Sequence, residues 1–190
     1  MGSIRTFGPV KLFIGTLVSE RSLIPGVEER LAGEYGPIDH RSEVIPFNFT
    51  DYYRHESGDS ILRVFLSFER LIEAEQLPEI KRRTNALENE FRGIQALVSR
   101  PINLDPGYLE NSKVILASTK NFYHRIYLGG GIFGEVTMHF KNTGFQFFPW
   151  TYPDYQSPEY QRFFLDLRRI YRTQLRSMCL VRREKINDSI

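Results

Sequence analysis

The stretch VKLFIGTLV, from Val10 to Val18, decides how the first half of the chain is interpreted. It is an almost continuous apolar run rich in β-formers, which is typical of a strand buried on both faces of a sheet. After it, apolar residues recur at helical spacing from Ile24 to Tyr35. Pro25 suits the first turn of that helix, and Gly36-Pro37 ends it. The chain therefore opens with a buried strand and a helix.

The next elements lie on both sides of a long aromatic-rich loop. A weaker strand is expected over residues 38–47, because its charges and Pro46 suit a sheet edge. The apolar run ILRVFLSF predicts a second strand over residues 61–68. Apolar residues from Ile80 to Phe91 share one stripe, which predicts a helix over residues 78–92.

A sixth element completes the first half. We expect a strand over residues 94–104, ended by Asp105-Pro106-Gly107, because proline followed by glycine suits a type II turn. The order strand, helix, strand, strand, helix, strand is that of the ferredoxin-like βαββαβ pattern.

The second half adds hairpin strands and a long helix. Strands are expected over residues 113–118, 123–128, 132–141 and 145–150, with Asn142-Thr143-Gly144 as a hairpin turn. Ser157-Pro158 begins a helix that runs to about Arg183. We therefore predict a single α+β domain over residues 1–190, with a mainly antiparallel sheet and helices on one face. Its ferredoxin-like first part is extended by the hairpin strands and the C-terminal helix.

The composition is that of a globular protein. Of the 190 residues, 41% are hydrophobic and 25% are charged, with a net charge of +2. No apolar run approaches the roughly 20 residues of a membrane-spanning helix, and the start lacks a signal-peptide pattern. The single cysteine excludes an internal disulfide and a zinc site built from several cysteines. We expect a cytoplasmic protein with no membrane partner.

The stretch LGGGIFGEV, residues 128–136, matches the glycine loop that protein kinases fold over ATP phosphates. A kinase also needs a catalytic-loop Asp and Asn and a D-F-G motif, which this chain lacks. A Rossmann fingerprint would have to open a helix, whereas residues 135–141 alternate like a strand. Two interpretations are left: the N–H groups of Gly129, Gly130 and Gly131 cradle an anion, or the glycines form a tight turn.

Polar residues gather between Asn103 and Tyr155 in numbers that a plain sheet does not need. Carboxylates and imidazoles carry out acid–base chemistry and bind divalent metals, while basic side chains and backbone N–H groups bind phosphate. The predicted catalytic residues are Glu135, Asp105 and His124. The predicted ligand-binding residues are Lys120, Arg125, Gly129, Gly130, Gly131, Thr137 and Asp154. A divalent metal would be held by Asp105, Glu135 and Asp154 with His124 or His139.

Each carboxylate also has a purely structural interpretation. Asp105 suits a turn, Glu135 a cross-strand ion pair, and Asp154 a loop or cap position. In the strand expected over residues 132–141, side chains alternate between two faces. One face should carry Glu135, Thr137 and His139, and the other Val136, Met138 and Phe140. We predict that the polar residues converge in one hollow, where Trp150 or a tyrosine could stack on a base.

Two helical stripes carry charge. In the C-terminal helix an apolar stripe should pack on the sheet: Tyr160, Phe163, Phe164, Leu167, Tyr171 and Met178. Nearly opposite it lies a row of arginines that is either a solvated face or a track for a nucleic-acid backbone: Arg162, Arg169, Arg172, Arg176 and Arg183. The earlier helix carries Lys81, Asn85, Glu88 and Arg92 on one stripe, which predicts an ion pair between Glu88 and Arg92.

Four strings in the second half resemble a known family: INLDPGYL, ASTKNFYHRIYL, GGGIFGEVT and PWTYPDY. Together they resemble the uncharacterised prokaryotic family named domain of unknown function 4416, over nearly the whole chain. The resemblance implies no established activity and no catalytic residue. Some members carry a "GTP-binding" label, but this chain lacks the G-x-x-x-x-G-K-[ST] loop, and residues 119–122 lack the Asp of N-K-x-D.

Three functions follow from these observations. The first is binding of a small phosphorylated, nucleotide-like ligand, with metal-assisted phosphate-ester chemistry if the protein is an enzyme. The second is an RNA- or DNA-binding module that uses the arginine row. The third is a non-catalytic interaction domain that contacts a partner through the aromatic loop over residues 47–53.

Overall fold

The computed structural model describes residues 3, 7–48, 61–93 and 98–187, and side chains up to residue 178 within the last helix. Its strands form one nine-stranded sheet in which every pairing is antiparallel. The strands are β1 (Lys11–Val18), β2 (Ile38–Arg41), β3 (Ile45–Pro46), β4 (Leu62–Phe68), β5 (Ile102–Leu109), β6 (Lys113–Ser118), β7 (Ile126–Gly129), β8 (Ile132–Lys141) and β9 (Gly144–Phe147). The α-helices are α1 (Ile24–Tyr35), α3 (Leu77–Glu90) and α4 (Pro158–Asn187), each preceded by a short 3-10 turn: η1 (Arg21–Leu23), η3 (Ala74–Gln76) and η4 (Pro153–Gln156).

The ferredoxin-like first part is confirmed. The order β2-β4-β1-β5 in the sheet is the one that a split βαββαβ unit produces, with β1 and β4 in the centre. All eight residues of β1 are buried, as its apolar run predicts. The second half extends the sheet beyond β5 in the order β6-β8-β7, and β9 pairs with β8.

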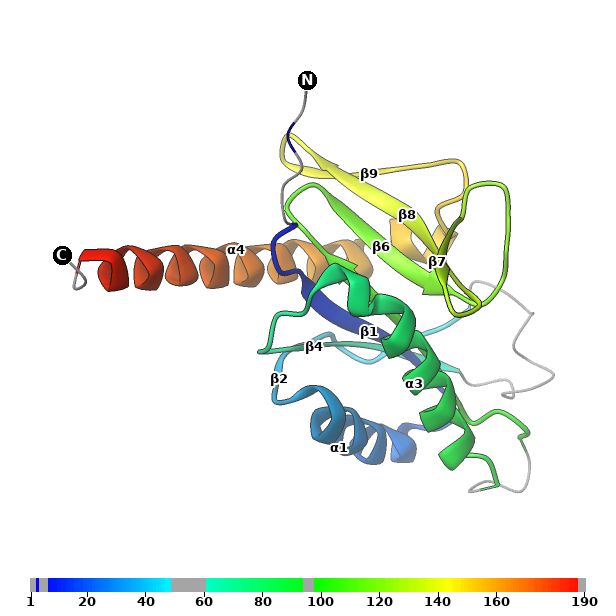
Figure 1. Ribbon diagram of the computed structural model, residues 1–190. Helices are drawn as coiled ribbons and strands as arrows, with labels where there is room; N and C mark the ends of the chain where they lie inside the picture. Colours follow the sequence, from blue (N-terminus) through cyan, green and yellow to red (C-terminus); the bar gives the residue numbers. More distant parts are fainter. Residues whose placement is uncertain (1–2, 4–6, 49–60, 94–97, 188–190) are drawn as a thin grey trace.

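Helices cover both faces of the sheet, so the prediction that all helices lie on one face is wrong (Figure 1). Alternate residues of β1 point to opposite sides: Leu12 and Ile14 pack under α1 and α3, and Phe13 packs under α4. The α4 side is a cluster of aromatic rings, in which Phe13 and Phe164 meet edge to face with centroids 5.0 Å apart.

Only the first half of α4 rests on this cluster, and the rest of the helix extends past the sheet (Figure 1). The buried stripe is confirmed as far as Tyr171, but Met178 is 39% exposed. Arg162, Arg169, Arg172 and Arg176 are exposed, and Arg169 pairs with Asp166. The side chain of Arg183 lies outside the described residues. In the described part of the chain, no helix is both long and apolar enough to cross a membrane.

The predicted turn at Asp105-Pro106-Gly107 is wrong, because β5 runs through it. Gly107 fits the strand for a steric reason: a Cβ there would lie 2.4 Å from the backbone oxygen of Ile115 and 2.5 Å from the Phe13 ring. Proline has no N–H to donate, and β6 pairs with β5 only from Gly107 to Leu109. Before that point β5 pairs with β1 alone, so the sheet opens between β5 and β6.

Strict alternation along β8 is also wrong. The register between β6 and β8 shifts where Val114 pairs with Met138 and Ile115 pairs with Val136. Met138 consequently packs in the aromatic cluster under α4, whereas Val136 packs on the α3 side. The extra residue in β8 thus changes which side chains share a face, as β-bulges do.

Candidate functional site

A cavity of about 1130 Å³ opens where β5 and β6 separate. Its lining comes from α3, from β4 and β5, from the ends of β6 and β8, and from the η4 turn. Within the described residues, six basic and four acidic side chains line it: Arg63, Lys81, Arg92, Arg100, Lys120 and Arg125, with Glu88, Asp105, Glu135 and Asp154. Part of the predicted set of polar residues between Asn103 and Tyr155 therefore converges here, with further contributions from earlier in the chain.

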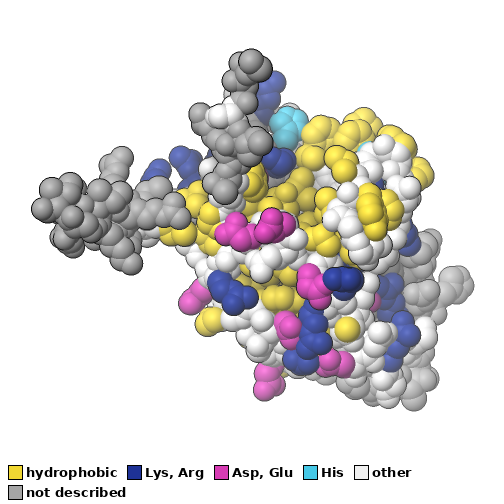
Figure 2. All heavy atoms as spheres, in the orientation of Figure 1, with side chains coloured by type: hydrophobic (Ala, Val, Ile, Leu, Met, Phe, Trp, Pro, Cys, Tyr) yellow, Lys and Arg dark blue, Asp and Glu magenta, His cyan; other side chains and the backbone are white. Residues whose placement is uncertain are grey.

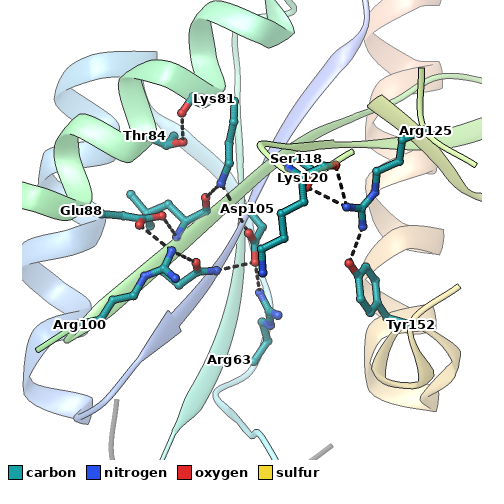
Figure 3. Close-up of polar contacts among 12 residues, drawn as sticks. Arg63, Lys81, Thr84, Glu88, Arg100, Asp105, Ser118, Lys120, Arg125 and Tyr152 are labelled. Carbon is teal, nitrogen blue, oxygen red and sulfur yellow. Dashed lines mark hydrogen bonds and ion pairs between the residues drawn. The ribbon is translucent and has the colours of Figure 1, made fainter. Parts of the chain in front are cut away.

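Arg63 lies at the floor of the cavity and contacts two carboxylates, of which Figure 3 shows Asp105. Its Nη1 lies 3.5 Å from Asp105 and its Nη2 lies 3.7 Å from Asp154. Arg63 is only 4% exposed, and its Nε donates to the hydroxyl of Tyr160 at 3.2 Å. Nη1 makes no hydrogen bond with any described residue. A buried guanidinium with an unsatisfied N–H group is costly and favours a bound acceptor.

The two carboxylates at the floor, Asp105 and Asp154, have surroundings that shift their pKa values in opposite directions. Asp105 lies 3.6 Å from Lys81 as well as 3.5 Å from Arg63, and it accepts a hydrogen bond from Asn103 at 2.7 Å. Burial opposes ionisation of Asp105, but Lys81 and Arg63 together hold its pKa below the ordinary value. Asp154 is 5% exposed, and burial raises its pKa because Arg63 offsets the lost hydration only in part.

At the wall formed by α3, the buried side chain of Glu88 attaches the helix to β5. Glu88 accepts from Arg100 at 2.8 Å and from the backbone N–H of Leu104 at 2.8 Å (Figure 3). The predicted ion pair between Glu88 and Arg92 is therefore wrong, because Glu88 turns towards β5 instead. Lys81 donates to the Leu104 carbonyl at 2.7 Å, so both side chains fasten α3 to the unpaired edge of β5.

The opposite wall is organised by Arg125, whose side chain is 8% exposed. Its Nε donates to Glu135 at 2.7 Å, and its Nη1 donates to Ser118 at 3.1 Å and to the carbonyl of Lys120 at 2.9 Å. Its Nη2 donates to the Tyr152 hydroxyl at 2.8 Å (Figure 3). Arg125 thus joins β6, β8 and the segment before η4, which leaves it little donor capacity for a ligand.

Glu135 is enclosed by protein donors. His124 Nε2 lies 3.1 Å from the same carboxylate oxygen that Arg125 contacts, and the Thr137 hydroxyl donates to the other at 3.3 Å. The interpretation of Glu135 as a cross-strand ion-pair residue fits this geometry. Trp150 is sandwiched between His124 and Phe148, with ring centroids 5.2 Å and 4.8 Å away, so its faces are not available to a base.

The model of the family described as domain of unknown function (DUF4416) matches residues 8–171. The chain belongs to this family. No curated protein and no solved structure matches it. The range matched by DUF4416 contains every residue that lines the cavity, and it ends where α4 leaves the sheet.

Five of the ten site residues predicted from the sequence line the cavity of this DUF4416 protein. Those that line the cavity are Asp105, Lys120, Arg125, Glu135 and Asp154. His124 and Thr137 do not line the cavity, but both contact the Glu135 carboxylate. Gly129, Gly130 and Gly131 do not line the cavity: they have φ angles of 107°, 59° and 79° at the turn between β7 and β8. The tight-turn interpretation of the glycines therefore fits, because only glycine adopts these angles at low cost.

The predicted metal ligands are not assembled. The described residues contain no group of three or more His, Cys, Asp or Glu side chains that could hold a metal ion. Glu135 is separated from the two floor carboxylates by its pairing with Arg125, while Asp105 and Asp154 face Arg63. His139 packs against the Phe148 ring at 5.1 Å, away from these groups.

Arg63 is the functional candidate that the sequence prediction missed. It is the only charged residue of the run ILRVFLSF, and a charge inside a buried strand is rare unless it is paired. That signal was present in the sequence. The stripe Lys81, Asn85, Glu88 and Arg92 also proves to line the cavity, together with Asn89.

Hydrophobic side chains gather outside the cavity, over the part of the sheet formed by β7, β8 and β9 (Figure 2). Phe122, Tyr123, Ile126 and Tyr127 are between 58% and 76% exposed. Of the predicted aromatic loop over residues 47–53, residues 49–53 lie outside the described residues, and Phe47 is buried in the cavity wall.

Proposed function

We propose that the cavity binds a small phosphorylated ligand of nucleotide size. The observation that carries the proposal is the buried Arg63, which lines the cavity and whose Nη1 lies 3.5 Å from Asp105 but makes no hydrogen bond with a described residue. Phosphate oxygens are strong acceptors that pair with guanidinium groups, so a phosphate would satisfy this donor.

The charge of the lining supports an anion. The ten ionisable Lys, Arg, Asp and Glu side chains include six cations and four anions, which leaves a positive excess. Arg63, Arg100 and Arg125 each contact a carboxylate, whereas the Arg92 guanidinium has no hydrogen bond or ion pair with a described residue. Lys120 is exposed at the opposite wall. Arg92 and Lys120 are therefore the cations best placed to attract a phosphate from solvent.

The size and the other lining groups support a nucleotide-like ligand. A volume of about 1130 Å³ exceeds that of most sites for drug-sized ligands, which span roughly 300–1,000 Å³. Asn85 and Asn89 offer amide groups along α3, and Tyr152 offers a ring that is 47% exposed. Amides that read base edges and a ring that stacks on a base are what nucleotide recognition needs.

Calorimetric titration tests this proposal. Inorganic phosphate and the nucleoside mono- and triphosphates would be titrated into the wild-type protein and into an Arg92→Ala/Lys120→Ala variant. Since hydrogen bonds to charged groups contribute about 1.5–3 kcal/mol each, we expect the variant to lose roughly 10-fold or more in affinity. Arg82→Ala is the control, because Arg82 is an exposed arginine of α3 that pairs with Glu79 outside the cavity.

The expected control result is wild-type affinity. If none of these phosphates binds the wild-type protein, the proposed function is wrong. If Arg82→Ala weakens binding as much as the double substitution does, the ligand is attracted by general surface charge and the cavity is not its site.

A further inference from the structure

The two carboxylates at the cavity floor share one arginine but differ in everything else that surrounds them. Asp105 faces Lys81 on α3 and Arg63 on β4, accepts from Asn103, and lies near Arg100. The groups that face Asp154 are Arg63, the neighbouring Tyr155, Tyr160 of α4 and Asp105 itself. Asp105 is therefore stabilised as an anion by two cations, whereas Asp154 has one cation at 3.7 Å in a buried, tyrosine-lined position.

Resting on the proposed phosphorylated ligand, we propose that the cavity floor hydrolyses its phosphate ester. Asp105 acts as the general base and Asp154 as the general acid. Enzymes that use two carboxyl groups for acid–base chemistry assign the roles by environment, keeping one ionised and the other protonated. The Arg63 guanidinium contacts both carboxylates, Asp105 through Nη1 and Asp154 through Nη2, and there it would stabilise the negative charge of a transferring phosphoryl group.

The reaction is balanced with water as the only co-reactant. The Asp105 carboxylate takes a proton from a water molecule as the water oxygen bonds to phosphorus. The bond between phosphorus and the ester oxygen breaks, and the leaving oxygen takes the proton of Asp154. The products are inorganic phosphate and the alcohol. Transfer of a proton from Asp105 to Asp154, directly or through solvent, restores the starting state.

The pKa directions of the two groups agree with these roles and fix the expected pH profile. Burial, only partly offset by Arg63, raises the pKa of Asp154, so the acid is lost as the pH rises through a value above 3.8. Lys81 and Arg63 outweigh burial and lower the pKa of Asp105, so the base is lost only as the pH falls below 3.8. Activity should therefore decline on the alkaline side as Asp154 ionises.

The test compares two esters that differ in leaving group. Nucleoside 5′-monophosphates release a poor leaving group that needs a proton, whereas p-nitrophenyl phosphate releases one that leaves without it. We expect Asp105→Asn to lower both rates by roughly 100-fold or more. Asp154→Asn should lower nucleotide hydrolysis by about 100-fold but p-nitrophenyl phosphate hydrolysis by less than about 10-fold.

The ratio of the two rates is independent of the fraction of folded protein, so a partly unfolded variant still gives an answer. Glu79→Gln, on the exposed face of α3, is the control and should keep both rates. Binding of nucleoside 5′-methylenephosphonates, which cannot be hydrolysed, is measured in parallel. Binding without hydrolysis of either ester overturns this inference and leaves the proposed function standing. An unchanged rate ratio in Asp154→Asn also overturns it. Absence of both binding and hydrolysis overturns both proposals.

Discussion

Replacing Arg63 by methionine removes the guanidinium from the cavity floor and keeps much of the apolar stem. The change leaves Asp105 with Lys81 at 3.6 Å, because that ion pair does not involve Arg63. Asp154 loses its contact at 3.7 Å, and the described residues offer it no other ion pair. Above the pKa of Asp154, the main consequence should therefore be a carboxylate that is buried without a cation.

The magnitude follows from the burial of both partners. Removing one member of a buried ion pair costs roughly 3–5 kcal/mol. Protonation of Asp154 limits the cost, because keeping a carboxyl neutral requires about 1.4 kcal/mol for each pH unit above its pKa. From the ordinary value of 3.8 to pH 7 this limit is about 4 kcal/mol. Since burial already raises the pKa of Asp154, we expect a loss of about 3 kcal/mol at pH 7 and about 1 kcal/mol at pH 5.

Urea unfolding of the wild type and Arg63→Met at both pH values measures these losses, and at pH 7 the Tm should fall by roughly 6–12 °C. Arg30→Met is the control, because Arg30 forms a surface pair with Glu90 whose side chains are 38% and 43% exposed. The control should lose much less than Arg63→Met at pH 7, because water screens an exposed ion pair. If Arg63→Met loses no more than the control, or loses more at pH 5 than at pH 7, the account of the cavity floor is wrong.

Two further predictions concern packing and pH. Gly107→Ala should lower the free energy of unfolding in urea by roughly 1–3 kcal/mol or more, because the new Cβ would meet the Ile115 oxygen at 2.4 Å. Gly8→Ala, with nothing within 4 Å, is its control, and equal losses would contradict the packing described for β5. Burial raises the pKa of Tyr160 to about 12, so stability that is present below pH 10 should be lost as the pH rises towards 12. Tyr160→Phe should show a shallower decline of the urea midpoint over this range, and a decline as steep as that of the wild type would count against the buried position of this hydroxyl.

The ferredoxin-like half could be predicted because its signals are local. The apolar run of β1 and the stripe of α3 each follow from which residues neighbour one another along the chain. The predicted turn at Asp105-Pro106-Gly107 failed because turn preference is only one of the reasons for choosing proline and glycine. Here Gly107 admits the Ile115 oxygen, and Pro106 lies just outside the ladder with β6. Neither reason can be seen before the neighbouring strands are known.

The candidate site could be predicted as a region but not as a set of roles. Asp105 and Asp154 were identified because carboxylates in a polar stretch stand out. Arg125 was expected to bind phosphate, yet its donors are used by Glu135, Ser118 and Tyr152. Which basic side chain faces a ligand depends on which acceptors the folded chain brings beside it, and the sequence does not contain those distances.

By itself the sequence determined the order of strands and helices, the buried central strand and the presence of a polar region near the end of the sheet. Only the tertiary structure decided that Arg63 of β4 and Asp154 of η4 meet, and that the sheet opens between β5 and β6 beside Pro106 to form the cavity that both residues line. The physical reason is that secondary structure follows from short-range periodicity, whereas a site depends on the strand order and on where the hydrogen-bond ladder ends.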